Sequence, residues 1–151
     1  MNSNRGFTLI ELLVVIGVIA ILAAVVLVAV NPGRQFAQAR DTQRRSDLYS
    51  ITNAIYQYAA EHEGNLPDTD GDPVTDNFPT TPTCIGAGAG CFNLGVAGDD
   101  VTVVPTYMAE IPADPATGDA ANTGYLINVD ANGRVVASGS GELVEAITVT
   151  R

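Results

Sequence analysis

Four aspartates stand at positions 1, 3, 5 and 9 of a potential calcium-binding loop: Asp68, Asp70, Asp72 and Asp76. Carboxylate oxygens at this spacing can wrap a single Ca²⁺ ion. Two residues depart from the pattern, because Pro73 replaces the glycine of the sharp turn and Pro79 replaces the bidentate glutamate. The segment therefore has two interpretations, a calcium site and a solvated acidic loop.

The two cysteines, Cys84 and Cys91, bracket a loop rich in glycine and alanine. In an exported chain such a pair predicts a disulfide. A metal site is the alternative, but it needs further ligands, and His62 is the sole histidine. The sequence contains no residue set typical of nucleophilic or acid–base catalysis, so we expect a protein that is not an enzyme and requires no cofactor, with calcium left open.

A lone carboxylate, Glu11, precedes 19 consecutive apolar residues, 12–30. As a helix this run is about 28 Å long, close to the hydrocarbon thickness of a bilayer. An acidic side chain deep in hydrocarbon costs roughly 2.5–3.5 kcal/mol on insertion scales, so Glu11 needs a partner. The cations available within the first thirty residues are the amino terminus and Arg5. A cleaved secretory signal, a plain anchor and an assembly segment are the three interpretations.

The motif G-F-T-L-I-E-L, Gly6–Leu12, resembles the N-terminal signature of type IV pilins and of type II secretion pseudopilins. The resemblance implies that a prepilin peptidase cuts after Gly6 and that Phe7 becomes an N-methylated first residue. It also implies that Glu11 is the filament-assembly carboxylate. A neighbouring subunit's Phe7 ammonium beside Glu11 would offset the cost of burying either charge alone and would favour one axial register. A carboxylate that snorkels to the interface or is protonated is the alternative.

The resemblance implies four segments: a leader (1–6), a transmembrane or filament-core helix (7–30), its amphipathic continuation (31–62) and a globular head (63–151). The leader would face the cytoplasm and the head the outside, in a single-pass membrane protein that becomes extracellular on assembly. The positive-inside rule indicates the opposite orientation, because four arginines follow the span and Arg5 alone precedes it. The motif and the cysteine pair favour the outward head.

The segment V-N-P-G-R interrupts the apolar helix, because Pro32 lacks a backbone donor and Gly33 adds conformational freedom. Either a kink or a helix end with a new start is expected there. Beyond it, apolar residues repeat at helical spacing and predict the face on which a sheet packs: Leu48, Ile51, Ile55, Tyr58 and Ala59, with Phe36 and Ala39 extending the stripe. The polar face with Arg40, Asp41, Arg44, Arg45 and Asp47 is expected either to be solvated or to meet acidic heads of neighbouring subunits.

The C-terminal part carries strand signals. Alternating residues on both sides of 130–133 predict a β-hairpin, and 142–150 predicts a further strand. The segment 101–112 reads as a strand or a short helical turn. The expected fold class is α+β: a long N-terminal helix, transmembrane in its first half and amphipathic in its second, packed on a small antiparallel sheet, as in pilins.

Charge is unevenly distributed, since residues 63–151 hold 13 acidic residues against two arginines. Such a head would repel phosphate backbones, so no nucleic-acid partner is expected. The resemblance favours a structural subunit of a pilus-like filament whose partners are identical or related pilin subunits, the prepilin peptidase and an inner-membrane platform with a cytoplasmic ATPase. A type II secretion pseudopilin and a non-polymerising, membrane-tethered, calcium-dependent binding module are the alternatives.

Overall fold

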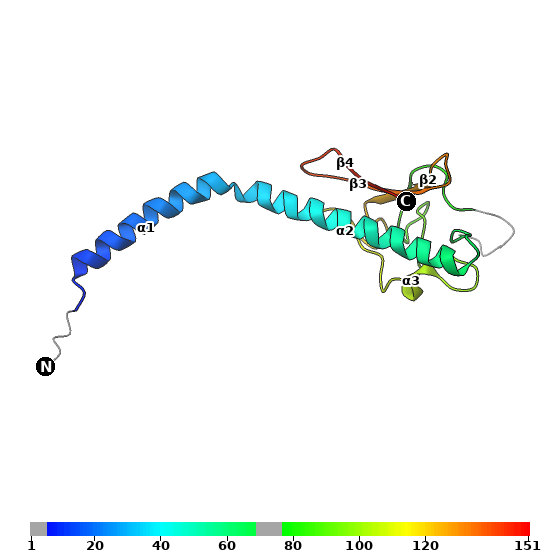
Figure 1. Ribbon diagram of the computed structural model, residues 1–151, viewed down its shortest axis with the longest axis horizontal. Coiled ribbons are helices and arrows are strands. Elements are labelled where there is room, and N and C mark those ends of the chain that lie inside the picture. Colours follow the sequence, from blue (N-terminus) through cyan, green and yellow to red (C-terminus); the bar gives the residue numbers. More distant parts are fainter. Residues whose placement is uncertain (1–5, 69–76) are drawn as a thin grey trace. The chain divides into compact units, whose positions relative to one another are not determined.

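The structure is a computed structural model that describes residues 6–68 and 77–151. Its elements follow in the order α1 (Leu9–Val30), α2 (Pro32–Glu61), β1 (Thr83–Cys84), α3 (Val103–Thr106), β2 (Tyr125–Val129), β3 (Val135–Ser140) and β4 (Ala146–Thr150) (Figure 1). The predicted α+β arrangement of a long apolar N-terminal helix and a C-terminal antiparallel sheet is confirmed. The chain forms two compact units, Met1–Phe36 and Ala37–Arg151.

The first unit is built on α1, a helix of 22 residues. Thr8 is its N-cap, and Asn31 ends it in the left-handed conformation with φ 45°. A new helix then starts at Pro32, a residue suited to the first helical position because its fixed φ is helical and no donor is lost there. The predicted interruption is therefore a helix end at Asn31 followed at once by a new start.

Helix α2 supplies one half of the core of the second unit and ends at Glu61. After it, Glu63 has φ 59° and the Gly64 amide donates to the Ala59 carbonyl oxygen at 2.8 Å, which together form a left-handed helix stop. The apolar positions predicted to face a sheet, Leu48, Ile51 and Ile55 among them, are fully buried. They join one cluster with inward-facing residues of the strands, which include Tyr125, Ile127, Val135, Ala137, Ile147 and Val149.

The predicted extension of the apolar stripe to Phe36 and Ala39 is wrong, because both side chains are exposed, Phe36 at 64%. The buried positions in this part of α2 are instead Ala37, Asp41 and Arg44. Polar side chains can occupy this buried face because loops from the rest of the head bring opposite charges to it.

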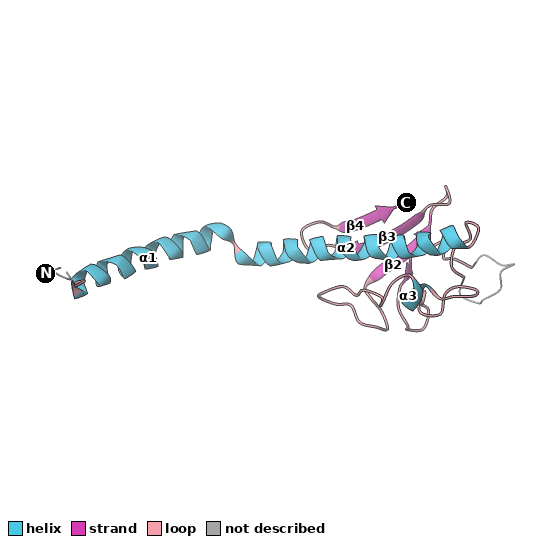
Figure 2. Cartoon of the chain, turned by 60° about the horizontal axis from the view of Figure 1, so that its bottom comes forward, coloured by secondary structure: helices cyan, strands magenta, loops and turns pink. Residues whose placement is uncertain are grey.

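The sheet has four antiparallel strands in the order β1-β2-β3-β4 (Figure 2). Strands β2 and β3 form the predicted hairpin, in which the Asp130 amide donates to the Arg134 carbonyl oxygen at 2.9 Å and Gly133 has φ +76°. Strand β4 begins at Ala146, later than expected, and the 101–112 segment contains the short helix α3. The head is thus one sheet with α2 packed on its inner face.

Candidate functional site

The N-terminal segment that carries the predicted processing site lies outside any helix. Residues 6–8 have no regular secondary structure, and among the described residues nothing beyond the chain neighbours of Gly6 lies within 4 Å of a Cβ built on it. The Phe7 side chain is 85% exposed. The Gly6–Phe7 bond is therefore outside α1 and next to an exposed side chain, and cleavage there stays a prediction.

Glu11 is held at the start of α1 by Thr8, in a reciprocal capping box. Its carboxylate accepts hydrogen bonds from the Thr8 amide at 2.9 Å and from the Thr8 hydroxyl at 2.8 Å, while the Glu11 amide donates to the Thr8 hydroxyl oxygen at 3.3 Å. The pairing of Glu11 with a cation stays a prediction, and Thr8 is a neutral hydrogen-bond partner within the same segment. The T-x-x-E spacing, a signature of a helix start, could have shown this from the sequence.

The capping box orients the carboxylate without neutralising it. A negative charge at a helix N-terminus is stabilised by the partial positive charge of the unpaired amides there. Thr8 supplies only neutral donors, so the net charge of Glu11 remains available to a cation. The site is therefore a fixed anion at the end of an apolar helix.

None of the residues of α1 is buried, although almost all of them are apolar. By length and composition this helix can cross a membrane. A continuous apolar surface of this size is not stable in water and needs lipid or other apolar helices around it.

The four aspartates of the possible calcium loop are only partly within the described residues. Asp68 is buried, whereas Asp70, Asp72 and Asp76 lie outside the described residues. Within residues 6–68 and 77–151 there is no group of three or more His, Cys, Asp or Glu side chains that could hold a metal ion. Calcium at this loop therefore stays a prediction.

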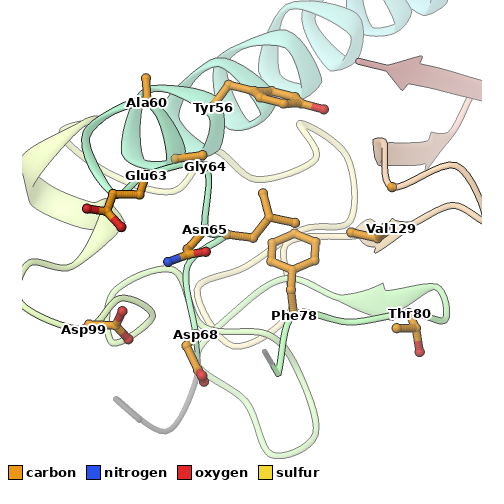
Figure 3. Close-up of a pocket in the computed structure, with 13 residues that line it drawn as sticks. Tyr56, Ala60, Glu63, Gly64, Asn65, Asp68, Phe78, Thr80, Asp99 and Val129 are labelled. Atoms are coloured by element: carbon orange, nitrogen blue, oxygen red, sulfur yellow. The ribbon is translucent and has the colours of Figure 1, made fainter. Parts of the chain in front are cut away.

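Asp68 lines a cavity of about 750 Å³ between the end of α2 and the loops that follow it (Figure 3). Asp99 also lines the cavity on the acidic side, whereas Phe78 and Val129 give it an apolar wall. This mixed lining shows no set of groups arranged for acid–base or nucleophilic chemistry in the described part of the head.

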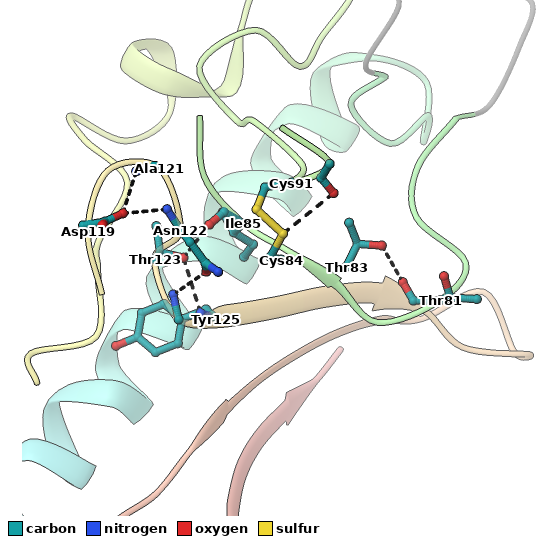
Figure 4. The surroundings of a disulfide bond; sticks show 12 residues. Thr81, Thr83, Cys84, Ile85, Cys91, Asp119, Ala121, Asn122, Thr123 and Tyr125 are labelled. Carbon is teal, nitrogen blue, oxygen red and sulfur yellow. Dashed lines mark hydrogen bonds between the residues drawn. A yellow bond between two sulfur atoms is a disulfide. The ribbon is translucent and has the colours of Figure 1, made fainter. Parts of the chain in front are cut away.

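Cys84 and Cys91 form a disulfide with an S–S distance of 2.06 Å (Figure 4). The loop that it closes is attached to a second loop by backbone hydrogen bonds from Ala87 to Ala120, 2.9 Å, and from Gly88 to Ala121, 2.8 Å. Because the two sulfurs are bonded to each other, the alternative of a cysteine metal site does not apply here. The bond fixes a surface loop beside β1.

A group of charges with a buried centre, Arg44, joins α2 to two distant loops. Arg44 is only 3% exposed, and its guanidinium donates to Asp114 at 2.5 and 3.2 Å and to Asp41 at 2.8 Å. It also lies 3.0 Å from Glu142, which in turn pairs with Arg40. We call these five residues the Arg44 cluster.

The Arg44 cluster corrects the expectation for the polar face of α2. Arg40, Asp41 and Arg44 are not merely solvated, since they pair within the same head. Contact of this face with neighbouring subunits stays a prediction. Asp47 is buried as well and accepts a hydrogen bond from the Tyr125 hydroxyl at 2.7 Å. Arg45, by contrast, is exposed.

Hydrogen bonds from the Arg44 guanidinium hold the pKa of the Asp114 carboxyl well below its ordinary value, and the Ala116 and Thr117 amides add to this effect. Burial raises the pKa of Asp41, but hydrogen bonds from the Glu142 and Leu143 amides outweigh burial and lower it. Both carboxylates therefore remain ionised in weakly acidic solution and keep the two loops attached to α2.

This electrostatic arrangement predicts how the head responds to acid. A carboxyl with a depressed pKa contributes stability above its unfolded pKa of about 3.9, and the contribution is lost as the pH falls through the folded value. Hydrogen bonds act likewise in the β2–β3 turn, where those from the Arg134 amide and guanidinium lower the pKa of Asp130 to about 2. The melting temperature of the full chain in detergent should be constant above about pH 5 and should fall between about pH 4 and 2. Asp114→Asn should flatten this fall, and an unchanged slope would contradict the assignment.

Comparison with known proteins gives two matches. Residues 1–27 match the family model described as the prokaryotic N-terminal methylation motif. Over 87 residues the chain is 38% identical to prepilin peptidase-dependent protein D of Escherichia coli (strain K12), a match that covers 58% of this chain and 58% of that protein. No solved structure matches the chain.

The matched motif spans Gly6, Phe7 and Glu11 and most of α1, so the comparison falls on the segment whose geometry is described above. The chain carries the prokaryotic N-terminal methylation motif, and on this motif and this relative it is similar to type IV pilins and pseudopilins.

Proposed function

We propose that this protein is a structural subunit of an extracellular, type IV pilus-like filament. A prepilin peptidase removes residues 1–6, the new amino terminus of Phe7 is methylated, and α1 then packs into the filament core. The observation that carries the proposal is the unburied apolar helix α1 directly after an exposed methylation motif. The name of the E. coli relative, a protein dependent on prepilin peptidase, supports the processing step.

Before assembly the subunit is held in the membrane by α1, with the leader in the cytoplasm and the head outside. A helix of 22 residues is about 33 Å long, enough to cross the hydrocarbon layer. The disulfide supports an outward head, because such bonds persist in oxidising compartments. An inner-membrane platform with a cytoplasmic ATPase would then extract the subunit into the polymer.

Glu11 and Phe7 form the assembly contact. The ammonium group of Phe7 on one subunit pairs with the Glu11 carboxylate of the next in a core from which water is excluded. Burying either ion alone costs several kcal/mol, whereas the pair offsets much of this cost. The capping box holds the carboxylate in place, so little conformational freedom is lost when the cation arrives.

A second candidate, a pseudopilin of a type II secretion system, uses the same N-terminal residues. The acidic, loop-rich head with its disulfide favours the pilus subunit.

A third candidate is a membrane-tethered module that never polymerises and would keep its leader. It would bind partners through calcium at Asp68, Asp70, Asp72 and Asp76. If a chelator leaves the melting temperature and the protease resistance of the protein unchanged, the calcium site is rejected for the pilus subunit and for the tethered module alike.

Mass spectrometry of the protein recovered from cells tests the processing step. The chain should begin at Phe7 and should be heavier by one methyl group than the sequence 7–151. Sheared surface filaments should contain this processed form as their dominant subunit. An intact Met1, or a cut near Ala29, would instead support the tethered or secreted alternatives and would overturn the proposal.

A further inference from the structure

Strand β4 has one unpaired edge. It lies at the end of the sheet, and its five residues pair with β3 in one unbroken register, so the strand has no bulge (Figure 2). No described residue donates to or accepts from its other edge in a strand pair. Proteins usually protect such an edge with lysine, proline or a bulge, and the sequence A-I-T-V-T contains none of these.

The register shows which backbone groups face this free edge. The Arg151 amide donates to the Val135 carbonyl oxygen at 3.0 Å, and Val135 lies opposite Arg151 when the register of β3 and β4 is continued by one residue. Because hydrogen-bonded positions alternate in an antiparallel pair, Ile147 and Val149 also direct their amides and carbonyls toward β3. The amides and carbonyls of Ala146, Thr148 and Thr150 therefore point outward along the free edge.

The two faces of β4 also differ. Ile147 and Val149 are buried against the core, whereas Ala146, Thr148 and Thr150 have exposed side chains. A strand added at this edge would continue both the inner apolar face and the outer threonine face.

The residues flanking β4 have opposite charges: Glu145 precedes it and Arg151 follows it, and both are exposed. In an antiparallel pair of two identical strands centred on Thr148, each residue meets its mirror position. Glu145 then faces Arg151 of the second copy at both ends, Ile147 faces Val149, and Ala146 faces Thr150. Cross-strand pairs of opposite charge and of β-branched residues both stabilise such a ladder.

We propose that the free edge of β4 is an interaction surface for a second copy of this chain, which pairs antiparallel about a two-fold axis through Thr148. The outward amides and carbonyls of Ala146, Thr148 and Thr150 supply the hydrogen bonds of this arrangement. Thr148 pairs with its own copy and Ala146 pairs with Thr150, each pair through two hydrogen bonds. The contact is isologous and closes on itself, so it forms dimers and does not extend a polymer. It does not depend on the proposed function.

The antiparallel arrangement fixes the direction of the two heads. Their α2 helices run in opposite directions, so the chain enters the two heads from opposite ends.

Cysteine cross-linking of the full chain in detergent tests the register. Thr148→Cys places two thiols across a hydrogen-bonded pair, whose Cα atoms lie about 5.5 Å apart, within disulfide range. Mild oxidation should convert Thr148→Cys into a covalent dimer. Thr150→Cys alone should give no dimer, because its copies lie about 14 Å apart along the strands, whereas Thr150→Cys mixed with Ala146→Cys should give one.

The control excludes association through α1 alone. Helices packed side by side in one micelle would bring every position next to its own copy and would cross-link Thr148→Cys and Thr150→Cys alike. Equal cross-linking at both positions, or none at Thr148→Cys, would overturn the proposal.

Charge exchange gives a second test without new cysteines. Glu145→Arg places like charges opposite each other at both ends of the paired strands. It should raise the dissociation constant of the dimer, measured by analytical ultracentrifugation, about tenfold. The double variant Glu145→Arg/Arg151→Glu restores both pairs and should recover the original dimer fraction. A double variant that stays as weak as the single one would contradict the pairing.

Discussion

Replacing Glu11 by alanine is expected to remove filaments from the cell surface below detection while the processed subunit stays in the membrane. In the proposed assembly contact, the substitution leaves the neighbouring Phe7 ammonium without a counter-ion in the filament core. Breaking a buried pair by removing one partner costs about 3–5 kcal/mol at each contact. Immunoblots of the sheared and membrane fractions measure both parts of the result.

Glu11→Gln separates the charge of Glu11 from its role in the capping box. Glutamine can accept the same hydrogen bonds from Thr8, so the start of α1 is retained. Loss of the cap alone would cost only about 1 kcal/mol. Filaments at the normal level in Glu11→Gln would show that the carboxylate charge is not needed and would overturn the ion pair.

Replacing Arg44 by methionine is expected to lower the free energy of unfolding of the head by about 3 kcal/mol or more. The substitution keeps most of the side-chain volume but leaves Asp114 buried without its guanidinium partner. Chemical unfolding of the full chain in detergent, followed by the near-ultraviolet circular dichroism of its tyrosines, measures the change.

The chain offers a matched control for this loss. Arg45 is adjacent in sequence but exposed, so Arg45→Met should change stability by no more than about 0.5 kcal/mol. The double variant Arg44→Met/Asp114→Asn should lose less than the sum of its single variants, because the two residues interact directly. Equal losses for Arg44→Met and Arg45→Met would show that the cluster does not stabilise the head.

Local sequence patterns predicted the elements whose signals are local. The apolar run predicted α1, and the helical repeat of Leu48, Ile51 and Ile55 predicted the buried face of α2. The turn ending at Gly133 predicted the hairpin. Each of these depends on residues within a few positions of one another, which is why periodicity and turn chemistry suffice.

The Arg44 cluster was not predictable in this way. Asp114 lies 70 residues from Arg44, and Glu142 lies 102 residues from Arg40, so no spacing along the chain links them. Charged residues on a helix are ordinarily exposed, and this default made the polar face of α2 look solvated. The candidate functional site differs in this respect, because the Thr8–Glu11 capping box lies within one turn of the chain and its T-x-x-E signature was present in the sequence.

The position of the Arg44 cluster has a mechanical consequence. The chain enters the head through the first turns of α2, and there Arg40, Asp41 and Arg44 attach this helix to the loops that carry Asp114 and Glu142. A tensile load arriving along the helix would reach these ion pairs before it reached the apolar core. Acid that protonates the carboxylates would weaken this attachment, so a pulled head should yield at lower force in acid than at neutral pH.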